Sequence, residues 1–214
     1  MTQKIIEVLL LFCAIFLASI FFILPFSRTH VFASPDESAV YAAAQAIAHT
    51  GSARASFAVL PEFPSLHPRS WVLQQGTLVP VGFLGLPILL ALPSYLGNER
   101  GAMVAVAFLV VSAVFPLWQL SKRWGRVAQW ISVFMYLTFP TVILYANRSL
   151  FPNLPATILT LWASYLFYRS ERVVGILLSG ILFAFALSVR PTEILWMTLW
   201  FVAACLVKRK EKKW

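Results

Sequence analysis

Two adjacent acids, Asp36 and Glu37, are the first residues of this chain whose types and position suggest chemistry. They follow Ser34 and open an alanine-rich stretch that stops near Gly51. A carboxylate at the membrane surface meets a lipid phosphate on one side and a hydroxyl from water on the other. It would take the proton of that hydroxyl as the oxygen attacks the anomeric carbon of a sugar. We expect both acids to be catalytic, although acids in a first helical turn also suit the helix dipole.

A leaving phosphate needs positive charge beside it. Arginine binds phosphate oxygens in bidentate fashion, which makes the arginines between apolar runs candidates for phosphate contacts. The alternative is that each arginine extends to lipid headgroups. No second His or Cys lies at ligand spacing from the histidine in this group, so the metal is unknown and a divalent cation stays open. The phosphate-binding candidates are His67, Arg69, Arg148 and Arg190.

The composition requires a membrane to position these residues. The chain has 214 residues, of which 60% are hydrophobic and 12% are charged, whereas soluble domains are about half apolar and about a quarter charged. A water-soluble fold of this size would not bury so much apolar surface. The apolar runs are 5–26, 78–96, 102–120, 127–146, 154–167, 173–189 and 194–207.

Basic clusters between these runs predict their orientation, because lysine and arginine mark cytoplasmic loops. The clusters lie at 122–126, at 169–172 and in the tail from Lys208. Four crossings between residues 102 and 207 place all three in the cytoplasm. The rule is kept if run 78–96, which contains Pro80, Pro87 and Pro93, is re-entrant or interfacial instead of a full seventh span.

The expected fold is therefore an all-α polytopic membrane protein with about six transmembrane helices and one re-entrant or interfacial segment. Residues 1–207 form a single membrane domain, and 208–214 form a basic cytoplasmic tail. Residues 27–78 form an extracytoplasmic loop, which carries a short amphipathic surface helix at 35–50. The first run is expected to be an uncleaved anchor, with a signal peptide as the alternative.

The net charge of +9 does not indicate nucleic-acid binding. The basic residues are grouped between apolar runs, and no face interleaves them with aromatic residues, as a nucleic-acid surface would. Membrane lipid is the expected partner of this charge.

The motifs taken together resemble the GT-C-type membrane glycosyltransferases, such as protein O-mannosyltransferases and bacterial aminoarabinose transferases. The resemblance begins with Asp36-Glu37, Tyr41 and Thr50-Gly51 in the first outward loop. It continues through Leu96-Gly97, the basic segment from Lys122 to Gly125, Phe139-Pro140 and Arg190-Pro191.

The resemblance implies a polyprenyl-phosphate sugar as donor, Asp36 as the base or a metal-linked acid, and inverting transfer outside the cytoplasm. It also implies a prokaryotic plasma membrane. Many members carry a further acid in the outward loop after residue 146, where this chain has Asn147, Arg148 and Asn153. Full-length members are longer, so the chain is expected to act as an N-terminal module with a second half or a second copy. The alternatives are a non-catalytic lipid-binding or assembly protein and an inactive truncated remnant.

Overall fold

The structure, a computed structural model, describes residues 2–23, 32, 34–55, 70–148 and 150–211, and most of them are helical. In chain order the elements are α1 (Thr2–Ile23), α2 (Pro35–Thr50), β1 (Trp71–Gln74), β2 (Thr77–Pro80), α3 (Gly85–Ser112), α4 (Val114–Ser121), the 3-10 helix η2 (Lys122–Trp124), α5 (Arg126–Thr138), α6 (Pro140–Asn147), α7 (Asn153–Arg169), α8 (Val173–Val189), the 3-10 helix η3 (Pro191–Glu193) and α9 (Ile194–Glu211).

The number of helices able to cross a membrane is smaller than the sequence predicted. Among the described residues, two helices are long and apolar enough to cross a membrane, Ile5–Ile23 and Gly85–Trp124. The number rises to four if each of two bent helix pairs forms one span. The expectation of about six spans is therefore wrong. The reason is length, because α7 and α8 have 17 residues each. Each rises only about 26 Å, against a hydrocarbon core of about 30 Å.

Two prolines produce the bent pairs. Phe139 and Arg190 each precede a proline and leave the helical region, with φ −66° and ψ 122° for Phe139 and φ −149° and ψ 81° for Arg190. A residue before proline is driven out of the helical region by contact with the proline ring. The helices bend by 46° at the first break and by 115° at the second. The second bend places Arg190 in a turn between α8 and α9.

α3 consists of two helical halves. Gly97 and Asn98 leave the helical region, and Asn98 has a φ of 51° and a ψ of −140°. The break is sharp, because a Cβ added to Gly101 would stand 2.2 Å from the carbonyl oxygen of Pro93. Eight residues of straight helix would separate those two positions by about 12 Å. The expected re-entrant or interfacial segment 78–96 is thus made of β2 residues and the first half of α3.

A β-hairpin, which the sequence-based expectation of an all-α fold omitted, follows residue 70. β1 and β2 pair in antiparallel fashion, with Trp71 opposite Pro80. The connecting residues Gln75 and Gly76 both have positive φ, at 52° and 76°. Positive φ at both positions is the requirement of a two-residue hairpin turn whose twist matches the strands.

α2 is covered on two faces and is not a free surface helix. Ala39 and Ala43 pack with Trp71 and Leu78 of the hairpin. Ala44, on a different face of α2, belongs to the main hydrophobic core, which extends through α3, α5, α7 and α8. The alanines allow the hairpin and α3 to approach α2 closely.

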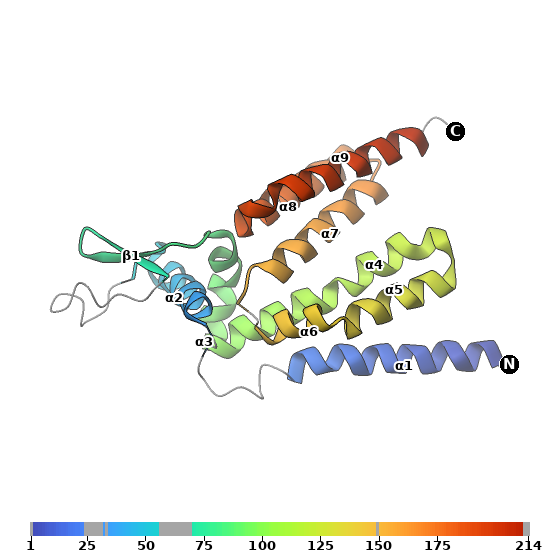
Figure 1. The fold of residues 1–214 in the computed structure, drawn as a ribbon, viewed down its shortest axis with the longest axis horizontal. Coiled ribbons are helices and arrows are strands. Elements are labelled where there is room, and N and C mark those ends of the chain that lie inside the picture. Colours follow the sequence, from blue (N-terminus) through green and yellow to red (C-terminus); the bar gives the residue numbers. More distant parts are fainter. Residues whose placement is uncertain (1, 24–31, 33, 56–69, 149, 212–214) are drawn as a thin grey trace.

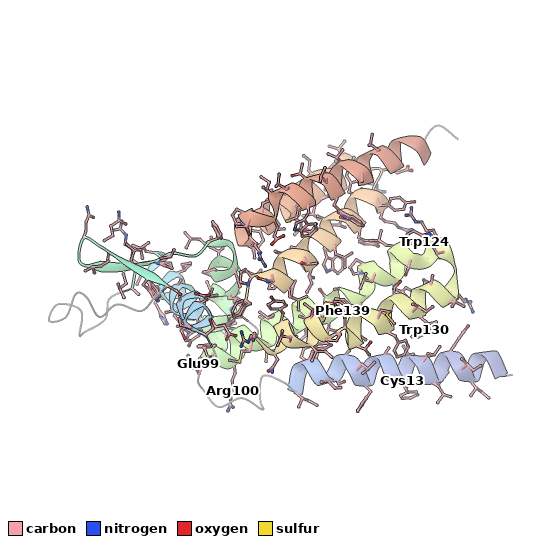
Figure 2. All side chains as sticks on the ribbon, viewed as in Figure 1. Cys13, Glu99, Arg100, Trp124, Trp130 and Phe139 are labelled. Carbon is pink, nitrogen blue, oxygen red and sulfur yellow. The ribbon has the colours of Figure 1, made fainter. Side chains whose placement is uncertain are left out.

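The two ends of the molecule differ in charge. Both termini and the turns that join α4 to α5 and α7 to α8 lie at one end, whereas α2 and the hairpin lie at the other (Figure 1). Figure 2 shows Glu99 and Arg100 at the α2 end and Trp124 at the end with the termini. The exposed basic residues of the two turns gather at the terminal end, and they are Lys122, Arg123, Arg126, Arg169 and Arg172.

Candidate functional site

A cleft of about 420 Å³ opens at the α2 end of the molecule. It is formed by segments that are far apart in the sequence, namely the start of α2, the ends of the hairpin, the start of α3, the start of α7 and the break between α8 and α9. Two of the predicted site residues, Asp36 and Arg190, line this one cleft. The polar lining residues are Asp36, Ser70, Asn153, Arg190 and Thr192.

Asp36 is held at the cleft by the local structure of α2. Ser34 is the N-cap, and its hydroxyl oxygen accepts a hydrogen bond from the Asp36 backbone N–H at 3.2 Å. Pro35 occupies the first helical position, where its missing N–H has no cost. The Ser70 hydroxyl donates a hydrogen bond to the Asp36 carboxylate. Because Ser70 directly precedes β1, the packing of the hairpin on α2 orients this carboxylate.

Arg190 is oriented by its neighbours in the turn. Its Nε lies 2.8 Å from Glu193 Oε1 and 3.4 Å from the Thr192 hydroxyl oxygen. The second Glu193 oxygen accepts a hydrogen bond from the indole N–H of Trp196. Within the part of the chain that the structure describes, no hydrogen bond is made by the terminal nitrogens Nη1 and Nη2 of Arg190. Nη1 and Nη2, which together can bind a phosphate in bidentate fashion, are thus not bonded to other described residues.

Helix N-termini add to the positive potential of the cleft. α2, α3 and α7 all begin at its wall, with Asp36, Leu86 and Asn153 in their first turns. The first N–H groups of a helix have no partner within the helix and carry a partial positive charge, which favours anions. No side-chain cap is present at the start of α3 or α7. The arrangement therefore suits an anionic group placed between these ends and Arg190.

The remaining lining of the cleft is apolar. Leu86, Pro87, Phe151 and Val189 form part of it. At the rim, Val81 and Phe83 also line the cleft, and both side chains are about half exposed or more, at 62% and 49%. A site that combines a small polar region with an apolar wall and rim suits an amphiphile whose headgroup is anionic.

The other predicted residues are placed differently. Glu37 is fully buried, at 0% exposure, and does not line the cleft. Arg148 is exposed at the end of α6, outside the cleft lining, and its guanidinium lies 5.8 Å from the ring centroid of Phe151, which does line the cleft. His67 and Arg69 lie outside the described residues.

Thr192 was not predicted, and Ser70 and Asn153 were not among the predicted site residues. Thr192 could have been found from the sequence, because it lies two residues after Arg190 in the turn that Pro191 begins. Ser70 is placed by the hairpin, which the expected all-α fold does not contain. Among the described residues, no group of three or more His, Cys, Asp and Glu side chains is arranged to hold a metal ion.

Comparison with known proteins adds no relative. No protein-family model matches the chain, and no curated protein or solved structure matches it.

Proposed function

We propose that this protein is a membrane glycosyltransferase, or a module of one, that transfers a sugar from a polyprenyl-phosphate donor to an acceptor hydroxyl. The observation that supports the proposal is the single cleft lined by Asp36 and Arg190. A carboxylate and a guanidinium are the two groups that such a transfer requires, and the apolar lining suits a prenyl chain.

The proposed reaction is a single displacement with inversion. Asp36 takes the proton of the acceptor hydroxyl as its oxygen forms a bond to the anomeric carbon. The bond from the anomeric carbon to the phosphate oxygen breaks, and the phosphate leaves with the electron pair. Nη1 and Nη2 of Arg190, with the starts of α3 and α7, stabilise the charge that develops on the phosphate. Ser70 orients the Asp36 carboxylate towards the acceptor.

The proposed location is a prokaryotic plasma membrane, with the cleft on the extracytoplasmic side and the C-terminus in the cytoplasm. The support is the gathering of exposed basic residues at the opposite end of the molecule, because basic residues near spans favour the cytoplasmic side. The proposed partners are the donor lipid, membrane lipid, and a second half or a second copy of the chain.

The test uses the full chain in lipid nanodiscs, with a synthetic polyprenyl phosphate as the binding probe and its sugar-loaded form as donor. Asp36→Asn should lower transfer about 100-fold or more, since a general base contributes at least that factor, while binding of the probe is kept. Arg190→Ala should weaken binding of the probe. Arg172→Ala, an arginine variant at the opposite end, should change neither. Unchanged transfer by Asp36→Asn would remove Asp36 from the mechanism.

A non-catalytic lipid-binding protein is the second candidate, favoured by the apolar lining and rim of the same cleft. Such a protein would bind the polyprenyl phosphate through Arg190 and transfer no sugar. Binding without transfer by the unmodified chain, both alone and with added membrane extract, would support this candidate over the enzyme.

A further inference from the structure

A second cleft lies near the end of the molecule that carries the termini. It has a volume of about 370 Å³ and is formed by α4, η2, α5, α7 and α9. Its apolar wall includes Leu117 and Leu120 of α4 and Leu161 of α7. None of its lining residues belongs to the cleft that holds Asp36.

The hydroxyl groups in this second cleft are bonded to the protein itself. Ser121, Ser132 and Ser164 each donate to a backbone carbonyl one turn earlier in their own helix, at 2.6, 2.8 and 2.8 Å. The Ser164 oxygen also accepts a hydrogen bond from the indole N–H of Trp200 at 2.8 Å. Serines bonded in this way offer little to a polar ligand. The wall therefore suits a hydrocarbon chain.

Among the described residues, Arg123 is the one charged residue in the lining of this cleft. The guanidinium carbon of Arg123 lies 4.0 Å from the ring centroid of Trp124 and 5.8 Å from that of Tyr168. Both aromatic residues also line the cleft. Tryptophan and tyrosine rings that flank a cation are typical of the membrane interface, where lipid headgroups lie.

The surroundings of Arg123 are basic as well. Lys122, Arg169 and Arg172 are exposed on neighbouring turns at the same end. Arg126 forms an ion pair with Glu7. The excess of positive charge at this end attracts anions from the membrane surface.

The geometry points to a binding site for an anionic phospholipid, with one acyl chain between α4, α7 and α9 and the headgroup phosphate on Arg123. The occupant is a structural membrane lipid and not the donor of the proposed transfer reaction. The inference is independent of the proposed enzymatic function, because the two clefts share no residue.

The test measures binding of phosphatidylglycerol and phosphatidylcholine to the purified full chain by native mass spectrometry. The unmodified chain should bind phosphatidylglycerol more tightly than phosphatidylcholine. Arg123→Gln should weaken phosphatidylglycerol binding about tenfold, which is the typical effect of one charge-assisted contact. Arg172→Gln removes the same charge at the same end outside the cleft and should change binding less than about threefold.

A second pair of variants tests the acyl-chain part of the site. Ala203 lines the cleft, whereas its neighbour Val202, which is exposed like Ala203, does not. Ala203→Phe should fill the cleft and weaken phosphatidylglycerol binding, while Val202→Phe should not. A thermal melt checks that each variant is folded.

Several results would overturn the assignment. Equal losses for Arg123→Gln and Arg172→Gln would mean attraction by overall charge alone. Unchanged binding by a folded Ala203→Phe variant would place the lipid outside the cleft. An equimolar polyprenyl phosphate could displace phosphatidylglycerol from the unmodified chain but not from Arg123→Gln. That result would assign the cleft to the polyprenyl lipid instead.

Discussion

Gly85, the first residue of α3, lies directly against the backbone of Val189 at the end of α8. A Cβ added to Gly85 would stand 2.4 Å from the Val189 nitrogen and 2.5 Å from the Ser188 carbonyl carbon. The residues that follow each of these positions, Leu86 and Arg190, line the cleft with Asp36. The absence of a side chain at Gly85 thus allows two walls of the cleft to meet.

Gly85→Ala should destabilise the protein by about 1–3 kcal/mol, because the added methyl group forces apart two backbones. The displacement should also move Arg190 and weaken binding of polyprenyl phosphate. Thermal unfolding in detergent and a binding titration measure the two effects. Gly180→Ala is the matched control, since a Cβ there meets nothing within 4 Å and alanine favours the helix by about 1 kcal/mol. Equal stability of Gly85→Ala and the unmodified chain would contradict this close contact.

Gln45 joins α2 to the first half of α3. Its side-chain nitrogen donates to the Tyr41 hydroxyl at 3.0 Å and to the Ser94 carbonyl oxygen at 2.8 Å. Gln45→Leu removes these two bonds and the contact of Gln45 Oε1 with His49 Nε2 at 3.0 Å. It leaves the Ser94 carbonyl, in a partly buried site, without this donor, which should cost about 1–3 kcal/mol. Thermal unfolding measures the loss, and hydrogen exchange should show faster opening of α2. Gln74→Leu, at an exposed strand end, is the control. If Gln74→Leu lowered the stability as much as Gln45→Leu, the effect would not be specific to the contact between α2 and α3.

Glu193 forms an ion pair with Arg190, so under the proposed function it competes with the donor phosphate for the guanidinium. Glu193→Gln keeps an oxygen that accepts from Nε but removes the neutralising charge, so polyprenyl phosphate should bind a few-fold more tightly at low salt. The gain should be no more than about fivefold, because a partly exposed ion pair is worth about 1 kcal/mol or less. It should shrink as the salt concentration rises. Weaker binding by Glu193→Gln would mean that the ion pair serves mainly to orient Arg190.

The phenol of Tyr41 should make stability depend on pH in the alkaline range. Burial raises its pKa, the hydrogen bond from Gln45 opposes this, and the negative charge of Glu99 raises it again, with a net upward shift. The unfolded chain releases the phenol proton near pH 10, while the folded protein still holds it. Folded protein then binds more protons than unfolded protein, so stability is present below about pH 10 and falls as the pH rises further.

Tyr41→Phe removes this titration. Its melting temperature should therefore fall less between pH 9 and about pH 11 than that of the unmodified chain. Tyr95→Phe, at an exposed position, is the control for loss of a phenol. Parallel pH profiles for Tyr41→Phe and the unmodified chain would contradict the prediction.

The hairpin and the number of long helices show where sequence patterns were insufficient. Gln75-Gly76 between Trp71 and Leu78 is a recognisable two-residue turn, but the second strand is continuous with the apolar run 78–96, so hydropathy does not separate the two. Hydropathy counts apolar residues and does not give helix length. At Pro140, the apolar run 127–146 continues while the helix does not.

Local sequence by itself determined α2 and its ends. Ser34 caps the helix, Pro35 starts it, and Gly51 ends it with a left-handed φ of 71°, because each of these preferences depends on only a few neighbouring residues. The sequence likewise determined that charge gathers in the turns.

Only the tertiary structure decided that Asp36 and Arg190 share a cleft, that Ser70 and Thr192 join them, and that Glu37 is buried away from it. These placements depend on contacts between distant segments, such as the hairpin on α2 and Gly85 on Val189. Such contacts follow from the packing of the whole chain, because they depend on how the surfaces of distant segments fit together. No short stretch of sequence determines that fit.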